Sequence, residues 1–178
     1  FLGEEIWLII DELRAQRKTG RSARMLFEVL GDLWVVSRNP YLHDDLIENP
    51  KRFKQLVEAM RHRIKSIEDR SFGNIKVAQL TTAALAAILK FEFDFKNAKK
   101  HRKKVLSKLK RYTKKHNIQF DGLARVSHVT DATDWRVEFP FVVINPDKES
   151  EISDIVKACI DLELTIIPRG GGTGYTGG

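Results

Sequence analysis

Glycine residues crowd the segment that follows Ile167. The segment reads Pro168-Arg169-Gly170-Gly171-Gly172-Thr173-Gly174-Tyr175-Thr176-Gly177-Gly178, and it holds six of the chain's 11 glycines. Glycine leaves the backbone bare, so that successive N–H groups can converge on one anion, for which phosphate is the natural ligand. Arg169 adds a positive charge. We therefore expect a phosphate-binding loop here, because a flexible linker rarely follows an apolar run so abruptly.

Two common phosphate motifs do not account for this loop. A P-loop needs a lysine after its glycines, and the segment has none. Gly172, Gly174 and Gly177 match the GxGxxG spacing of dinucleotide-binding folds. That fingerprint follows the first strand of its sheet and opens a helix, whereas this loop follows the second expected strand.

The elements that must position the loop are two apolar runs and a helix. Residues 141–144 and 164–167 are short, continuous and apolar, and each reads as a buried strand. Between them, Asp147 is placed to cap a helix over 148–162, whose expected inward face is formed by Ile152, Ile155, Val156, Cys159 and Ile160. Strand, helix and strand at this length predict a βαβ unit with parallel strands and a right-handed crossover.

From Phe141 to Gly178 the sequence resembles the start of the flavin-binding domain of the FAD-linked oxidases. These form the PCMH-type or vanillyl-alcohol oxidase group, and the branch of D-lactate, glycolate and D-2-hydroxyglutarate dehydrogenases is the most similar. The resemblance rests on Pro140-Phe141-Val142-Val143-Ile144-Asn145-Pro146, then an acidic helix, then the loop that begins Pro168-Arg169-Gly170. It covers about the last 40 residues.

The resemblance implies that the loop's backbone amides hold the pyrophosphate of FAD. The implied cofactor-binding residues are Pro168, Arg169, Gly170, Gly171, Gly172, Thr173, Gly174, Gly177 and Gly178. Relatives with covalent flavin carry His where Thr173 stands, so non-covalent FAD is implied. The parent enzyme would oxidise a small 2-hydroxy acid by hydride transfer to flavin and pass the electrons to an acceptor. The catalytic residues would lie in later sequence and are unknown, and this fragment alone would be inactive.

The chain opens with Phe1 and stops within the glycine-rich loop, so we expect the N-terminal part of a longer protein. Residues 1–118 read as successive helices, residues 119–139 as a connector, and residues 140–178 as the truncated start of the FAD-binding domain. The fold class is α+β. Some large bacterial FAD-linked oxidoreductases carry a helical domain of unknown function in this place. The segment 127–136, which leads into the first expected flavin strand, resembles theirs.

The helical region is predicted from apolar periodicity and helix-stop signals. The expected helices span 3–18, 22–36, 50–70, 75–95 and 96–116, with a short turn at 43–47. Ser22 is expected to cap the second helix, and Pro50 to lie in the first turn of the third. Trp7 and Trp34 lie on apolar stripes and are expected in the core.

The positive charge is concentrated in one segment. The chain has 31 Lys and Arg against 24 Asp and Glu, and residues 96–116 hold 11 of the basic residues and no acidic one. The rest of the chain has 20 basic and 24 acidic residues, so we do not expect general nucleic-acid binding. We expect this helix to be a solvated face or to dock on the remainder of the same chain. The alternative is a helical interaction module that recognises an acidic protein or nucleic acid, with a loop for another phosphate ligand.

Other reactive residues show no recognisable arrangement. The five histidines lack metal-ligand spacing, so no metal site is predicted. His128 is expected to make a structural hydrogen bond, and Cys159, the single cysteine, to be a small core residue. One cysteine excludes an internal disulfide and fits the cytoplasm. The longest apolar stretch, residues 81–89, is too short to span a membrane.

Overall fold

The computed structural model describes residues 2–16, 20–132 and 139–174. These residues form seven α-helices, one short 3-10 helix and a two-stranded sheet, so the α+β class is confirmed at this coarse level. The chain divides into two compact units, Phe1–Asn97 and Ala98–Gly178. Within the described residues, no helix is long and apolar enough to cross a membrane.

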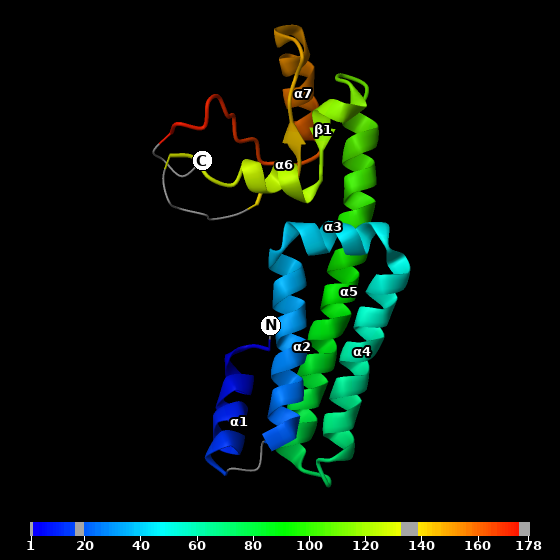
Figure 1. Ribbon diagram of the computed structural model, residues 1–178, viewed down its shortest axis with the longest axis vertical. Helices are drawn as coiled ribbons and strands as arrows, with labels where there is room; N and C mark the ends of the chain where they lie inside the picture. The colour runs from blue at the N-terminus through cyan, green and yellow to red at the C-terminus, as the bar shows by residue number, and fades with distance from the viewer. Residues whose placement is uncertain (1, 17–19, 133–138, 175–178) are drawn as a thin grey trace. The chain divides into compact units, whose positions relative to one another are not determined.

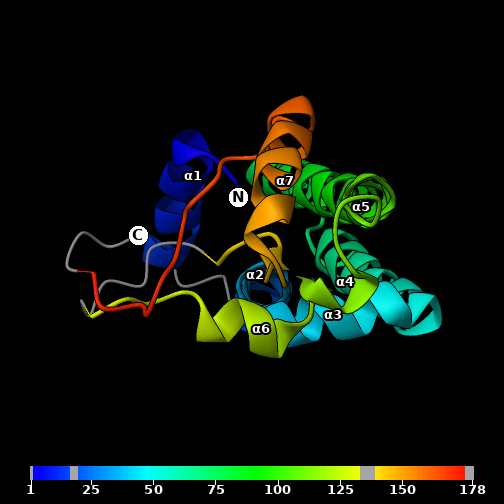
Figure 2. The ribbon, with the colours of Figure 1, turned by 90° about the horizontal axis from the view of Figure 1, so that it is seen from above.

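The first unit is a bundle of helices. It contains α1 (Glu4–Ala15), α2 (Gly20–Arg38), α3 (Pro40–Glu48), α4 (Pro50–Asp69) and the first part of α5 (Ile75–Leu109). In Figure 1, α2, α4 and this part of α5 run side by side, while α3 crosses the ends of α2 and α4. Figure 2 looks almost along α2 and shows α3 from its side. The most deeply buried apolar side chains of this core are Val29, Leu33, Met60, Ile64, Ala84 and Ile88.

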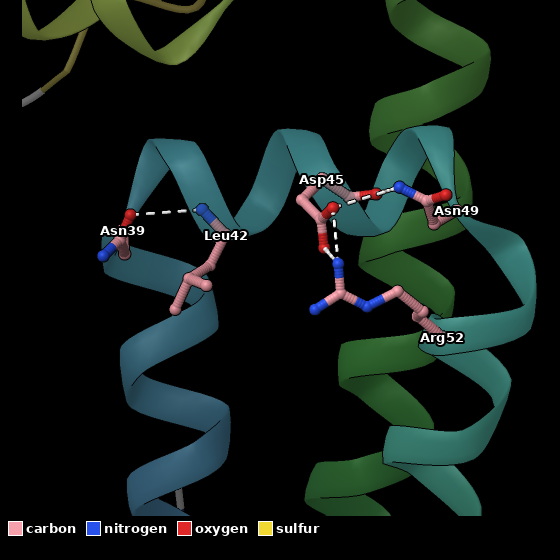
Figure 3. Close-up of polar contacts among 5 residues, drawn as sticks. All are labelled: Asn39, Leu42, Asp45, Asn49 and Arg52. Atoms are coloured by element: carbon pink, nitrogen blue, oxygen red, sulfur yellow. Dashed lines mark hydrogen bonds and ion pairs between the residues drawn. The ribbon is translucent and has the colours of Figure 1, made fainter.

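Two prolines begin consecutive helices in this bundle. Pro40 and Pro50 each stand at the start of a helix, where the missing N–H leaves no hydrogen bond unmade. Asn39 caps α3 through its side-chain oxygen, which accepts from the N–H groups of Tyr41 and Leu42 at 3.0 and 3.2 Å (Figure 3). The short turn expected at 43–47 is therefore wrong. This segment belongs to a helix, because Asn39 and Pro40 end α2 and start α3 at the same point.

The far end of α3 is fixed by a polar cluster. The side-chain amide of Asn49 donates to the carbonyl oxygen of Asp45 at 2.9 Å, and Arg52 Nη1 lies 2.6 Å from Asp45 Oδ2 (Figure 3). Arg52 is on α4, so the carboxylate of Asp45 joins α3 to the next helix. Inside the bundle, the rings of Phe53 and Phe95 stack with their centroids 4.1 Å apart.

Three further expectations for the helices are wrong. The structure has one continuous α5 over Ile75–Leu109, where the sequence predicted two helices. Helix α2 already begins at Gly20, so Ser22 lies inside it. Trp7 and Trp34 are 46% and 56% exposed, because the buried stripes of α1 and α2 run through Ile10 and Val29 instead.

The second unit has a smaller core of its own. It contains the end of α5, the 3-10 helix η1 (Lys115–Asn117), β1 (Ile118–Gln119), α6 (Gly122–Ser127), β2 (Val143–Ile144) and α7 (Glu149–Asp161). Its core consists of Val105, Leu109, Ile118, Ile155, Ala158, Cys159 and Leu162. Strands β1 and β2 pair antiparallel, with Ile118 opposite Ile144.

The expected parallel βαβ unit is not formed by the described residues. Residues 164–167 have no regular secondary structure, and β2 pairs with β1 instead. A strand needs a neighbour for its backbone hydrogen bonds. Within residues 164–167, Leu164 N–H donates to the carbonyl oxygen of Cys159 at 3.0 Å, which is a turn contact with the end of α7 and not a strand pairing. Ile166 and Ile167 are exposed.

The helix between these runs also differs in detail from the prediction. Lys148, rather than Asp147, stands at the N-cap of α7, and its side chain makes no capping hydrogen bond. Ile155 and Cys159 are buried as predicted, whereas Ile152 and Ile160 are exposed. The buried stripe instead includes Ala158, which belongs to the same core as Val105 and Leu109 of α5.

Candidate functional site

The glycine-rich loop begins after a sharp turn at the end of α7. Leu162 N–H donates to the carbonyl oxygens of Ala158 and Cys159, both at 3.1 Å, and Glu163 adopts the left-handed conformation with φ 56°. This turn ends the helix, and residues 164–169 follow it without regular secondary structure. Leu164 remains packed against the second core and anchors the segment.

Gly172 and Arg169 set the shape of the loop. Gly172 has φ +70°, a conformation that residues with a side chain rarely adopt. The Arg169 side chain folds back over it, so that a Cβ at residue 172 would lie 2.9 Å from Arg169 Cζ. The guanidinium is therefore held above a bare stretch of backbone. This puts a positive charge where an anion bound by the loop would need it.

The neighbouring glycines leave the backbone open. No atom lies within 4 Å of the position that a Cβ would take at Gly170, and at Gly171 the nearest atom is Thr173 Cγ2 at 3.8 Å. Residues 168–171, Thr173 and Gly174 are exposed. Among the described residues, no backbone hydrogen bond is recorded for the N–H groups of 170–173. These amides and the Arg169 guanidinium fit a phosphate group, which accepts several hydrogen bonds from such donors.

The end of the described loop is tied to the preceding connector. Ala132 N–H donates to the carbonyl oxygen of Gly174 at 3.0 Å, and Asp131 Oδ2 lies 3.5 Å from where a Gly174 Cβ would be. The sequence did not predict this contact, because nothing in the type of Ala132 indicates a distant partner. The carboxylate of Asp131 therefore borders the same loop at Gly174.

Of the predicted cofactor-binding residues, the structure places seven on this one continuous loop. These are Pro168, Arg169, Gly170, Gly171, Gly172, Thr173 and Gly174. Gly177 and Gly178 lie outside the described residues. Within the described residues, no group of three or more metal-ligating side chains is present.

Two lysines of the basic segment, residues 96–116, form ion pairs within the second unit. Lys108 Nζ lies 3.1 Å from Asp161 Oδ2, and Lys114 Nζ lies 2.7 Å from Asp147 Oδ2. The hydrogen bond to Lys114 lowers the pKa of Asp147, and the same bond raises the pKa of Lys114. Two of the lysines therefore hold α7 to the chain around the end of α5. These two lysines are therefore engaged within the second unit.

Two other candidate groups have structural surroundings. His128 Nδ1 lies 2.7 Å from the carbonyl oxygen of Ala124, so the ring donates this hydrogen bond at the end of α6 and the structural role predicted for it is confirmed. Cys159 is buried in the second core, as predicted, and this burial raises the pKa of its thiol. A thiol that resists ionisation is a poor nucleophile.

Comparison with known families supplies one match. Residues 1–93 match the family described as "Protein of unknown function (DUF3683)", which covers more than half of the 178 residues. Nothing among the curated proteins and nothing among the solved structures matches the chain. The match takes in α1 to α4 and the first part of α5, and thus most of the first unit. The chain therefore belongs to the DUF3683 family.

Proposed function

We propose that this chain is part of an FAD-dependent oxidoreductase and that its glycine-rich loop holds the FAD pyrophosphate without a covalent bond. The observation that carries the proposal is the open backbone of Gly170 and Gly171 next to Gly172, which has φ +70° and lies against the guanidinium of Arg169. The resemblance of residues 141–178 to FAD-linked oxidases supplies the identity of the ligand. Thr173, in place of the histidine that covalent relatives use, supports non-covalent binding.

The chain's own residues would bind and orient the cofactor. The amides of Gly170 to Thr173 would donate hydrogen bonds to phosphate oxygens, and Arg169 would offset their negative charge. A bound flavin would supply the hydride acceptor for a small 2-hydroxy acid, the substrate class that the resemblance implies. In the complete domain, we expect residues 164–167 to become the second strand of a βαβ unit. The exposed side chains of Ile166 and Ile167 support this, because a neighbouring strand or helix would cover them.

The test uses the longer chain that the proposal expects, with residues 1–178 followed by the rest of the flavin domain. The purified protein is desalted, its visible spectrum is recorded, and it is then precipitated with acid. Yellow protein that releases FAD into the supernatant would support the proposal. Colour that stays with the pellet would contradict the role of Thr173. A folded, colourless protein that takes up no added FAD would exclude the flavoenzyme and favour the interaction module.

A matched pair of glycine variants locates the cofactor. Gly172→Ala forces a side chain into φ +70° and displaces the Arg169 guanidinium, at a backbone cost of about 1 kcal/mol or more. We therefore expect FAD affinity to fall about fivefold or more. Gly31→Ala lies inside α2, where the added methyl meets nothing within 4 Å, and should leave FAD affinity unchanged. Equal FAD affinity in both variants would show that the loop does not bind the cofactor.

A further inference from the structure

A pocket of about 270 Å³ opens in the first unit. It lies where the end of α1, the start of α2, the end of α4 and the start of α5 come together, at the lower end of the bundle in Figure 1. Its lining is mainly apolar and includes Ile10, Leu13, Leu26, Ile67, Val77 and Leu80. A hollow of this lining favours an apolar ligand body, because binding removes apolar surface from water on both sides.

The charged residues of the pocket lining all have one sign. Arg14 and Arg70 line it, and the lining contains no Asp or Glu among the described residues. The Arg14 guanidinium lies 4.0 Å from Asp11 on the same helix, with both side chains largely exposed. Arg70 Nη1 lies 3.4 Å from Met25 Sδ, a neutral sulfur that accepts hydrogen bonds only weakly. Two guanidinium groups beside an apolar hollow are suited to a carboxylate that carries an apolar tail.

The turn beside the pocket adds an exposed aromatic ring. Phe72 lines the pocket, is 99% exposed, and has φ 49°, which is uncommon for a bulky residue. Strained backbone of this kind concentrates at ligand clamps. The side-chain oxygen of Asn74, which also lines the pocket, already accepts hydrogen bonds from the N–H groups of Lys76 and Val77 at the start of α5. Ser22, Ser71 and Thr81 also line the pocket, but Arg14 and Arg70 are its charged anchors, and Phe72 is an apolar surface that a bound ligand would cover.

We infer that this pocket binds a monocarboxylate that carries an apolar tail. The tail lies among the aliphatic side chains, and the carboxylate accepts from Arg70 and Arg14. Charge complementarity selects the anion over a neutral alcohol of the same length. The site is separate from the glycine-rich loop and takes a ligand of different chemistry from the small, polar 2-hydroxy acid.

Calorimetric titration of the 178-residue chain with decanoate tests this inference, and decanol is the neutral comparison. We expect saturable one-to-one binding of decanoate, at least about fivefold tighter than that of decanol. Because the titration contains no FAD, its failure leaves the proposed flavin site untouched. No binding of decanoate, or equal binding of both compounds, would overturn the inference. So would binding to phosphatidylglycerol vesicles without binding of free decanoate, which would indicate a membrane surface.

Three variants place the ligand. Arg70→Gln should weaken decanoate about fivefold and leave decanol unchanged, because it removes one guanidinium and keeps the apolar walls. Arg24→Gln makes the same change at an exposed site of α2 outside the pocket and should leave decanoate binding unchanged. Ala23→Phe, which fills the hollow, should weaken both compounds, with folding checked by circular dichroism. Equal losses of decanoate binding in Arg70→Gln and Arg24→Gln would show non-specific attraction to a basic chain and overturn the assignment.

Discussion

Asp147 and Lys114 form an exposed ion pair whose effect on the second unit depends on pH. Lys114 lies just before η1 and Asp147 just before α7, so the pair fastens the start of α7 to the segment that follows α5. The hydrogen bond between them keeps the pKa of Asp147 below its ordinary value of 3.8 and raises that of Lys114 above 10.5. Each shift means that the folded state favours the charged form of its residue.

The pair predicts how stability changes in acid and base. The contribution of Asp147 is fully present above pH 3.8 and is lost as the pH falls through its lowered pKa in the folded state. The contribution of Lys114 is present below pH 10.5 and is lost as the pH rises through its raised pKa. Asp147→Asn should therefore lose less stability than the parent chain between about pH 4 and pH 2. Urea unfolding across this range measures the difference.

The control for this prediction is Asp154→Asn on the exposed side of α7. Its carboxylate lies 3.6 Å from Lys157 of the same helix and joins no other element in the described residues. We expect it to keep the acid-side loss of the parent chain. If Asp147→Asn also kept that loss in full, the hydrogen bond to Lys114 would not stabilise the folded unit in solution.

At the scale of single residues, the sequence indicates which residues could bind a ligand or cap a helix, but not which distant residues they contact. The loop from Pro168 to Gly174 was predictable because glycine density and a neighbouring arginine are local signals. The contact of Ala132 with Gly174 was not, since a backbone amide donates from any non-proline residue. Asp147 was expected to be a helix cap because an aspartate before an apolar-periodic segment is typical of one. Its partner, Lys114, lies too far away in sequence for that pattern to show.

Helix α3 depends on Asn39 at its first turn. The Asn39 side-chain oxygen accepts hydrogen bonds from the backbone N–H groups of Tyr41 and Leu42, which would otherwise lack partners; Figure 3 shows the bond to Leu42. Asn39→Ala should lower the free energy of unfolding by about 1 kcal/mol, whereas Asn39→Asp, which keeps the acceptor, should restore most of it. Chemical denaturation of the three chains measures both values. A fully destabilised Asn39→Asp chain would show that the side-chain amide, and not the capping oxygen, matters.

Helix α5 shows why an element boundary was misplaced. The sequence changes from apolar to basic near Lys96, and this change predicts the end of one helix. Yet residues 75–109 contain no glycine or proline, and most of them are good helix formers. A change of surroundings alters which face is buried without stopping the backbone hydrogen bonds. The basic composition thus marks the passage from one unit to the other within a single helix.

At the scale of the whole chain, two separate cores share one helix. The larger core includes Leu33, which is fully buried on α2, and the smaller one includes Leu109, which is fully buried at the end of α5. The sequence predicted that the first unit is built of amphipathic helices, although Trp7 and Trp34 are exposed rather than in its core. It predicted the second less well, since the expected parallel sheet would bury Ile166 and Ile167, which are exposed here.

Because the two cores are separate, we expect a substitution in one core to destabilise mainly the unit that contains it. Leu33→Ala should destabilise the first unit by about 2–5 kcal/mol, and Leu109→Ala the second by a similar amount. Hydrogen exchange followed by mass spectrometry reads each unit through its own helices. We expect Leu33→Ala to speed hydrogen exchange in α2 and α4 but not in α7. We expect Leu109→Ala to speed exchange in α7 but not in α2 and α4. Leu89→Ala, at a side chain that is 57% exposed, is the matched control and should change little. If Leu33→Ala sped exchange in α7 as strongly as in α2, α5 would couple the two cores into one cooperative structure.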